Sequence, residues 1–181
     1  MTDIRQELLE KAKAMGIKLT AQQADQFQTY MELLLEWNEK MNLTAITDPE
    51  QAARLHMLDS AALLLCADFQ GGKTLIDVGT GAGLPGLPLK ILVPSLQVTL
   101  LDSLGKRVDW LNQVCAQLGL EGIQAIHARA EEQALVKGYR DSFDFVTARA
   151  VNLAQLIKNL GITKQKIRQV MLVGGGRVSY Y

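Results

Sequence analysis

The fold is decided by the stretch TLIDVGTGAGLPG, residues 74–86. Residues 74–78 form a compact apolar run typical of a buried parallel strand, and they lead directly into a loop that holds four glycines. Glycine lets the backbone approach a ligand closely, and amide groups at a helix N-terminus can hold an anionic group. The stretch therefore predicts a strand, a ligand-binding loop and the start of a helix.

The chain that follows this loop repeats the alternation of strand and helix. Three more apolar runs predict strands, at 96–101, at 123–127 and at 143–147. Helical periodicity fills the first two intervals, at 87–92 and at 108–118. Strands that alternate with helices predict a doubly wound α/β sheet of the Rossmann-like kind.

The pattern of the first 70 residues predicts helices only, without strands between them. Thr20 and Gln23 have the spacing of a capping box, and an apolar stripe at three- and four-residue steps follows over 27–37. Asp48-Pro49 predicts the start of a third helix, to about Cys66. We expect a helical cap over 1–70, a core over 71–150 and an atypical tail over 151–181, all in one compact unit.

Charge sets the tail apart. The chain has 181 residues with 19 Lys plus Arg and 19 Asp plus Glu. Residues 149–181 hold six basic and no acidic side chains, so residues 1–148 hold 19 − 6 = 13 basic against 19 acidic ones. The apolar fraction of 48% excludes a disordered or collagen-like chain.

The sequence also bears on metal binding and on where the protein is located in the cell. The two cysteines form no CxxC pattern and have no histidine at ligand spacing, so no metal site is expected. The first residues lack the apolar core of a signal peptide and no long apolar run follows, which predicts a soluble cytoplasmic protein without a membrane segment. We also expect a monomer.

Two ligand classes fit the glycine loop. Gly81-x-Gly83-x-x-Gly86 matches the dinucleotide fingerprint, and Asp102 lies 19 residues past Gly83, where an acid binds ribose hydroxyls. Asp77 favours a different ligand, because a carboxylate aimed at the loop repels a pyrophosphate but suits an ammonium group, such as that of S-adenosylmethionine. A methyl donor is therefore preferred, with a nicotinamide-dependent oxidoreductase as the alternative.

Further motifs lie in order along residues 1 to about 150. They are Asn42-Leu43-Thr44 after Trp37-Asn38, His56-x-Leu58-Asp59-Ser60, the loop from Asp77 to Gly86, Leu101-Asp102-Ser103-x-x-Lys106-Arg107, Arg129-Ala130-Glu131 and Phe143-Asp144-x-Val146-x-x-Arg149-Ala150. In this combination the sequence resembles the small-subunit ribosomal RNA methyltransferase G family, also called glucose-inhibited division protein B. The resemblance implies a class I S-adenosylmethionine methyltransferase fold.

The resemblance implies methyl transfer from S-adenosylmethionine to N7 of one guanine of 16S rRNA, nucleotide 527. The partner is then 16S rRNA or the small ribosomal subunit. The chemistry of guanine is compatible with this reaction, because N7 carries an exposed lone pair and needs no general base. In agreement, the sequence shows no nucleophile with a neighbouring histidine. No catalytic residue is assigned.

The loop pattern itself gives Asp77, Gly81, Gly83 and Asp102 as cofactor-binding candidates. The resemblance implies five more, which are Gly79, Leu84, Ala130, Glu131 and Arg149. Some have plainer alternatives. The alternative for Glu131 is an acidic helix start and that for Arg149 a strand-end surface charge, whereas His56 fits a packing histidine best. Lys106 and Arg107 either contact phosphate or lie on a solvated face.

After Val151 the sequence departs from the family, whose members continue with a helix, a strand leading to a lysine-containing loop, and a final pair of strands. Residues 152–181 instead offer a basic run and Val170–Val173 before three glycines. We expect C-terminal strands to be missing and the sheet edge unpaired, with impaired stability and activity, as in a truncated or frameshifted gene. A non-catalytic RNA-binding remnant with a basic tail is the third alternative.

Overall fold

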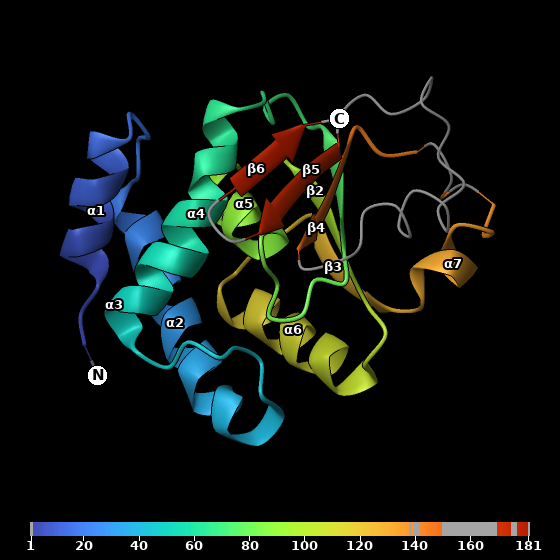
Figure 1. Ribbon diagram of the computed structural model, residues 1–181, viewed down its shortest axis with the longest axis horizontal. Coiled ribbons are helices and arrows are strands. Elements are labelled where there is room, and N and C mark those ends of the chain that lie inside the picture. Colours follow the sequence, from blue (N-terminus) through green and yellow to red (C-terminus); the bar gives the residue numbers. More distant parts are fainter. Residues whose placement is uncertain (1, 138, 140–141, 150–169, 175–176, 181) are drawn as a thin grey trace.

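A six-stranded sheet forms the centre of the protein (Figure 1) in a computed structural model that describes residues 2–137, 139, 142–149, 170–174 and 177–180. The strand order is β3-β2-β1-β4-β5-β6. The strands are β1 (Thr74–Val78), β2 (Gln97–Asp102), β3 (Ile123–His127), β4 (Phe145–Arg149), β5 (Val170–Gly174) and β6 (Arg177–Tyr180). All pairs are parallel except β5 with β6. The α/β prediction is confirmed.

The C-terminal strands differ from the expectation. The sequence predicts that they are missing, but β5 pairs with β4, from Val146 opposite Val170 to Arg149 opposite Val173. β6 then pairs antiparallel with β5. The physical reason is composition, because Val170–Val173 is an apolar run that suits a parallel strand, and only residues 175 and 176 separate it from β6. The edge of β4 is therefore paired.

Helices lie before and between the strands. They are α1 (Arg5–Ala14), α2 (Ala21–Met41), α3 (Pro49–Ala52), a π-helical turn η1 (Ala53–Leu58), α4 (Asp59–Ala61), a 3-10 turn η2 (Ala62–Leu65), α5 (Gly86–Leu92), α6 (Gly105–Gln117) and α7 (Ala130–Gln133). The predicted capping box of α2 is confirmed, since Thr20 and Gln23 each accept the other's backbone amide. Asp48 caps α3 as predicted. No helix among the described residues is long and apolar enough to span a bilayer.

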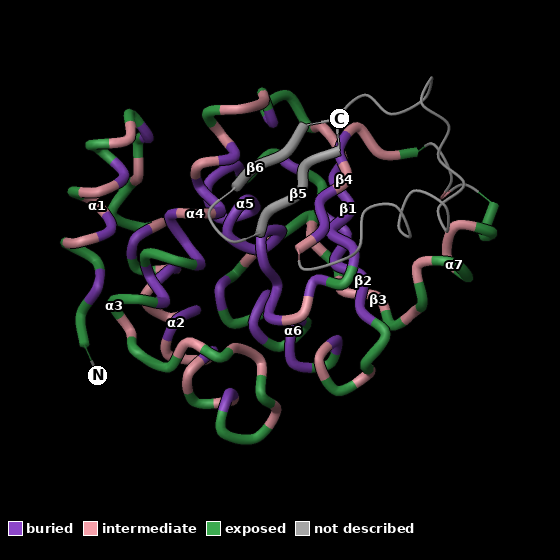
Figure 2. Tube along the Cα trace, viewed as in Figure 1, coloured by how far each residue is buried: buried purple, intermediate pink, exposed green. Residues whose placement is uncertain are grey.

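The cap and the sheet share one hydrophobic core (Figure 2). It joins Leu8 of α1, Leu34 of α2, Leu75 of β1 and Trp110 of α6, each no more than 1% exposed. The apolar stripe predicted on α2 faces this core. Because a shared core resists sliding of its parts, the cap is held in a fixed position against the loop that follows β1.

Tyr30 makes the polar contact between cap and loop. Its side chain is fully buried, and its hydroxyl donates to the carbonyl oxygen of Ala82. Burial raises the pKa of Tyr30 above its ordinary value. The neutral hydroxyl is thus kept as the donor.

We predict that Tyr30→Phe lowers the free energy of unfolding by about 1 to 2 kcal/mol, because it leaves the Ala82 carbonyl buried without its donor. Urea unfolding measures the change. Tyr139→Phe is the matched control, since that half-buried ring packs on Phe143 outside the cap. An unchanged midpoint for Tyr30→Phe would contradict a stabilising role for this hydrogen bond.

Candidate ligand site at the carboxyl edge of the sheet

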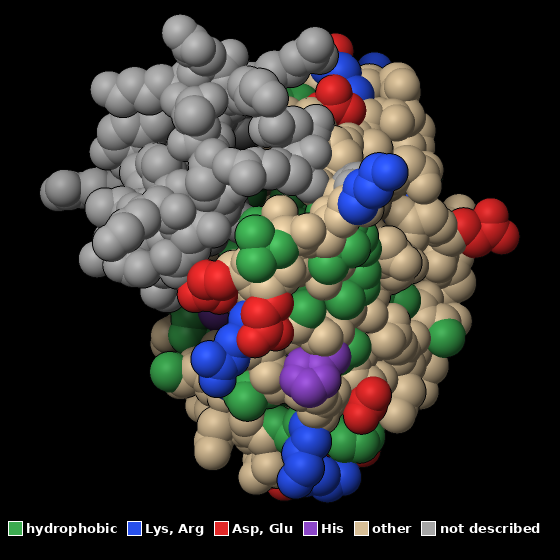
Figure 3. Space-filling view, turned by 90° about the vertical axis from the view of Figure 1, so that its right-hand side faces the viewer, with side chains coloured by type: hydrophobic (Ala, Val, Ile, Leu, Met, Phe, Trp, Pro, Cys, Tyr) green, Lys and Arg blue, Asp and Glu red, His purple; other side chains and the backbone are tan. Residues whose placement is uncertain are grey.

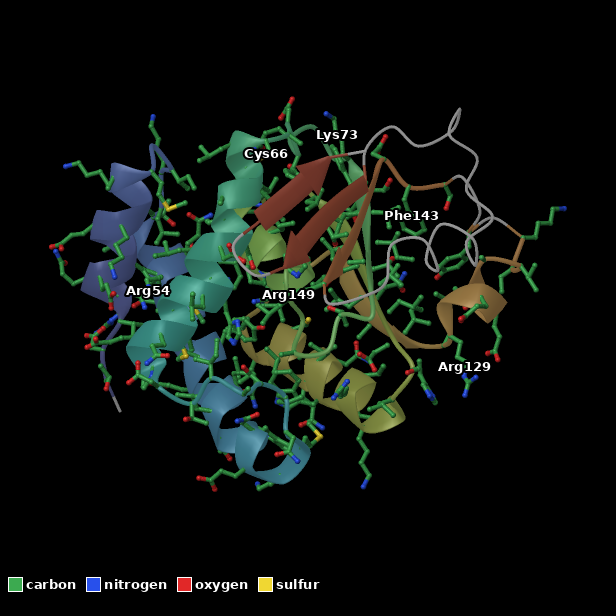
Figure 4. All side chains as sticks on the ribbon, in the orientation of Figure 1. Arg54, Cys66, Lys73, Arg129, Phe143 and Arg149 are labelled. Atoms are coloured by element: carbon green, nitrogen blue, oxygen red, sulfur yellow. The ribbon has the colours of Figure 1, made fainter. Side chains whose placement is uncertain are left out.

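The predicted site residues meet at one edge of the sheet. β1 is flanked by β2 and by β4, so the chain winds in opposite directions from this point. Ligands of open α/β sheets bind at such a switch point, outside the carboxyl ends of the strands. Asp77, Asp102 and Arg149 lie at or near the carboxyl ends of β1, β2 and β4. In Figure 4, Arg149 lies between the cap helices and the sheet, whereas Arg129 lies apart, near α7.

Asp77 is buried at the junction of β1, the loop and β4. The residue is 0% exposed. Its Oδ2 accepts from Thr80 Oγ1 at 2.6 Å and from the Gly86 amide at 3.1 Å, and its Oδ1 accepts from Thr147 Oγ1 at 2.9 Å. The sequence predicts a carboxylate aimed at the loop. The structure places it beneath the loop, bonded to Thr80 and Gly86, where it fixes the loop's shape.

Opposing effects act on the Asp77 carboxyl. The pKa of Asp77 is raised to about 6, because the effect of burial outweighs the hydrogen bonds from Thr80, Thr147 and Gly86 and the charge of Arg149, which lower the pKa. Thr147, which sequence reasoning missed, is 0% exposed. A polar residue among the apolar residues that precede Arg149 in β4 was the available signal.

Most backbone amides of the glycine loop donate to acceptors within the protein. Seven amides between residues 79 and 88 donate to internal acceptors, and Pro85 and Pro88 have none to give. The seven belong to Gly79, Thr80, Gly81, Gly83, Leu84, Gly86 and Leu87. Their acceptors include both aspartates. The loop therefore does not offer the row of open amides that sequence analysis expected for an anionic group.

The glycines have two different roles. A Cβ on Gly86 would lie 2.5 Å from Leu100 Cδ2, and one on Gly83 would lie 3.0 Å from Leu111 Cδ2, so these two let α5 pack closely on the core. Gly81 has φ +59°, and its nearest contact for a Cβ is the Gly79 carbonyl at 4.0 Å. The face of the loop above Gly81 is therefore open to a ligand, and only glycine leaves it so without backbone strain.

Asp102 links β2 to the loop. It is 4% exposed, its Oδ2 accepts from the Gly81 amide at 2.9 Å, and its Oδ1 accepts from the Leu104 amide at 2.9 Å. Arg107 Nη1 lies 3.8 Å from Oδ2, so this arginine forms an ion pair with Asp102. A carboxylate has about four acceptor positions, so each oxygen keeps room for a further donor.

The other carried-over residues surround this centre. Leu84 is buried in the core and Gly79 is exposed on the loop. Ala130 packs on the small cluster around Val78, and Glu131 is exposed in the first turn of α7. The described residues hold no group of three or more potential metal ligands.

Arg149 faces the cap. Its Nη1 lies 3.3 Å from His56 Nδ1, and its Nη2 donates to the Leu55 carbonyl at 3.2 Å. His56 is 5% exposed, and its Nε2 lies 2.7 Å from Thr44 Oγ1. The burial of His56 agrees with its interpretation as a packing histidine. Its contact with Arg149 also connects it to the carboxyl edge of the sheet, where the predicted site residues meet. Lys106 is exposed.

Comparison with known proteins identifies the family. The family model of GidB, rRNA small subunit methyltransferase G, matches residues 23–178. The chain belongs to this family. The match continues through most of the tail that sequence analysis set apart, consistent with the pairing of β5 and β6.

Curated relatives are similar over much of the chain. The ribosomal RNA small subunit methyltransferase G of an Exiguobacterium species is 51% identical over 145 residues, which cover 80% of this chain and 61% of that protein. The corresponding protein of Clostridium botulinum is 50% identical, over 80% of this chain and 60% of its own length. The chain thus spans about three fifths of these relatives.

Solved structures share the fold. A putative protein-L-isoaspartate O-methyltransferase from Plasmodium falciparum aligns over 97% of this chain and 85% of its own, with a TM-score of 0.57 and 15% identity. A putative S-adenosyl-L-methionine-dependent methyltransferase from Methanococcus maripaludis aligns over 80% and 62%, with a TM-score of 0.57 and 13% identity. At these identities the likeness shows the fold alone.

We predict a pH dependence from Asp77. Its folded pKa of about 6 lies above its ordinary value of 3.8, so the folded chain holds the proton more tightly between these two pH values. The Asp77 contribution to stability is therefore present at low pH and is lost as pH rises from about 4 to about 6.

Urea unfolding at successive pH values measures this contribution as the difference between the unaltered chain and Asp77→Asn. The difference is expected to fall by a few kcal/mol over that range, since one pKa unit corresponds to about 1.4 kcal/mol. Asp109→Asn, at an exposed position on α6, is the control. A difference that rises with pH would contradict the assignment.

Proposed function

We propose that this chain binds S-adenosylmethionine and serves in methyl transfer to N7 of a guanine in 16S rRNA, nucleotide 527 in the family. The observation that carries the cofactor assignment is the state of the glycine loop. Seven of its amides are bound internally, two of them by Asp77 and Asp102, so the loop suits a ligand without phosphate groups.

A dinucleotide fits this loop poorly. Pyrophosphate recognition at a Rossmann loop depends on open amides at the start of the helix. In α5 the Gly86 amide donates to Asp77, the Leu87 amide donates to the Gly83 carbonyl, and Pro88 has no amide. The two carboxylates beneath and beside the loop add repulsion. The nicotinamide alternative is therefore disfavoured.

S-Adenosylmethionine fits the groups that remain. We assign the ribose hydroxyls to Asp102, whose position is fixed by its two amide donors. The cofactor lies over the open face of Gly79 and Gly81, with Gly83 and Leu84 shaping the loop beneath it. Arg149 pairs with the carboxylate of the methionine part, and Ala130 with Glu131 borders the adenine. Asp77 acts through the loop and through its charge.

Methyl transfer to guanine N7 depends on the orientation of the two reactants rather than on acid–base catalysis. S-Adenosylmethionine supplies a methyl group activated by a sulfonium charge. Guanine N7 has a lone pair available without deprotonation. His56 accordingly has no proton to remove, and both of its ring nitrogens are engaged within the protein. The residues of this edge exclude water and hold the two reacting partners in line.

An rRNA substrate is supported by family membership. On the side that carries α7, basic and acidic side chains are interspersed among hydrophobic ones (Figure 3). The described residues on this side thus form no continuous basic stripe of the kind that tracks phosphates. A base exposed in a loop suits this surface better than a duplex, because the deep major groove of A-form RNA hides N7.

The cofactor assignment is tested by calorimetry. We predict that the chain binds S-adenosylmethionine and S-adenosylhomocysteine but not NAD. Asp102→Ala is expected to weaken binding by roughly 1 to 3 kcal/mol, since it removes a charged hydrogen-bond acceptor. Asp109→Ala serves as the control on the neighbouring helix. Tight NAD binding would refute the assignment.

The reaction is tested with labelled S-adenosylmethionine and 30S subunits that lack the family's methylation. Label is expected at N7 of a single guanine in 16S rRNA, because family membership predicts one target. Subunits that already carry the modification are the control. Binding of S-adenosylmethionine without any transfer would support the cofactor site and contradict the activity of this form.

A further inference from the structure

The helical cap reaches the ligand edge through a chain of hydrogen bonds. It begins at Asn38 of α2, whose Oδ1 accepts from the Thr44 amide at 2.7 Å. Thr44 Oγ1 lies 2.7 Å from His56 Nε2, and His56 Nδ1 lies 3.3 Å from Arg149 Nη1. Three residues, from α2, from the segment that follows it and from η1, are thereby connected to Arg149 at the end of β4.

The direction of each bond follows from the donors available. Arginine has only donors, so His56 Nδ1 accepts from Arg149 and the ring proton lies on Nε2. Nε2 therefore donates to Thr44 Oγ1, which also accepts from the Ile46 amide at 3.1 Å. Burial, and then the charge of Arg149, lower the pKa of His56 to about 4, so the ring is neutral near pH 7.

Local structure holds both ends of this chain in place. Asn42 ends α2 with φ 48°, a left-handed conformation that turns the backbone so that Thr44 comes back toward α2 and η1. The π-helical turn η1 presents the Leu55 carbonyl and the His56 ring to the same guanidinium. π-Helical turns occur frequently at functional sites.

Arg149 is held by the cap while its charge acts on the loop. It is half-buried, and two of its nitrogens contact η1. Its charge lowers the pKa of Asp77 and of Tyr30, on either side of the loop. Within the described residues no carboxylate forms an ion pair with it. A guanidinium in this setting keeps donors for an anionic group of a ligand.

We propose that His56 is a positioning residue of the ligand site, which fixes the Arg149 guanidinium through Nδ1 while Thr44 and Asn38 fix the His56 ring. The inference rests on the proposed cofactor function. It goes beyond that function by assigning the cap a part in ligand affinity. The cap then acts on the ligand through an arginine and not through a direct contact.

Two substitutions separate this role from simple packing. His56→Phe keeps a ring of similar volume and removes the acceptor. His56→Asn loses volume but keeps an acceptor, because Asn Oδ1 and His Nδ1 are both bonded to Cγ. Packing alone predicts that Phe is tolerated better than Asn, whereas positioning predicts better ligand affinity with Asn.

Calorimetry with S-adenosylhomocysteine measures the affinity. We expect about 10-fold weaker binding for His56→Phe and a loss of no more than about 3-fold for His56→Asn, since one hydrogen bond to a charged group is at stake. In an Arg149→Leu background, His56→Phe is expected to cause no further loss. Gln26→Ala, which removes another hydrogen bond between cap and core, from Gln26 Nε2 to the Leu118 carbonyl at 3.0 Å, is the control and should leave affinity unchanged.

The outcomes are distinct. If the unaltered chain binds S-adenosylhomocysteine and the His56→Phe variant binds it as tightly as His56→Asn or more tightly, the positioning role is overturned. The proposed cofactor then stands. A chain that binds no S-adenosylhomocysteine contradicts the proposed function, and this inference falls with it. Nitrogen NMR of the unaltered chain tests the bonding even where a variant does not fold, because a proton on Nδ1 would overturn it.

Discussion

The Asp77 carboxylate holds together the three elements that converge on the carboxyl edge of the sheet. It lies at the end of β1, and its donors come from the loop, from the start of α5 and from Thr147 of β4. A buried carboxylate is costly unless it is hydrogen-bonded. The loop conformation that satisfies it is therefore strongly favoured, and the path of residues 79–86 follows from this requirement.

The open surface of the site depends on that arrangement. Because most of the loop amides are bound internally, selectivity comes mainly from the space over Gly81, the spare acceptor positions of Asp102 and the donors of Arg149. The loop thus supplies shape, and side chains on neighbouring strands supply charge. This division differs from a phosphate-binding Rossmann loop, in which backbone amides hold the ligand.

Much of the fold follows from local patterns. The run at 74–78, the glycine loop and the apolar stripe of α2 each have a period or a residue type with one strongly preferred structure. The C-terminal strands were harder to predict. A short apolar run such as Val170–Val173 gains its stability from pairing with β4, and 20 residues separate the two strands in the sequence.

The sequence by itself determined the order of strands and helices as far as β4, the glycine loop and the resemblance to the family. Tertiary structure alone decided which side chains face a ligand and which hold the scaffold. Asp77 meets Thr147 across 70 positions, and His56 meets Arg149 across 93. Burial and hydrogen bonding between such distant residues depend on how strands and cap pack, and local propensity carries no record of that packing.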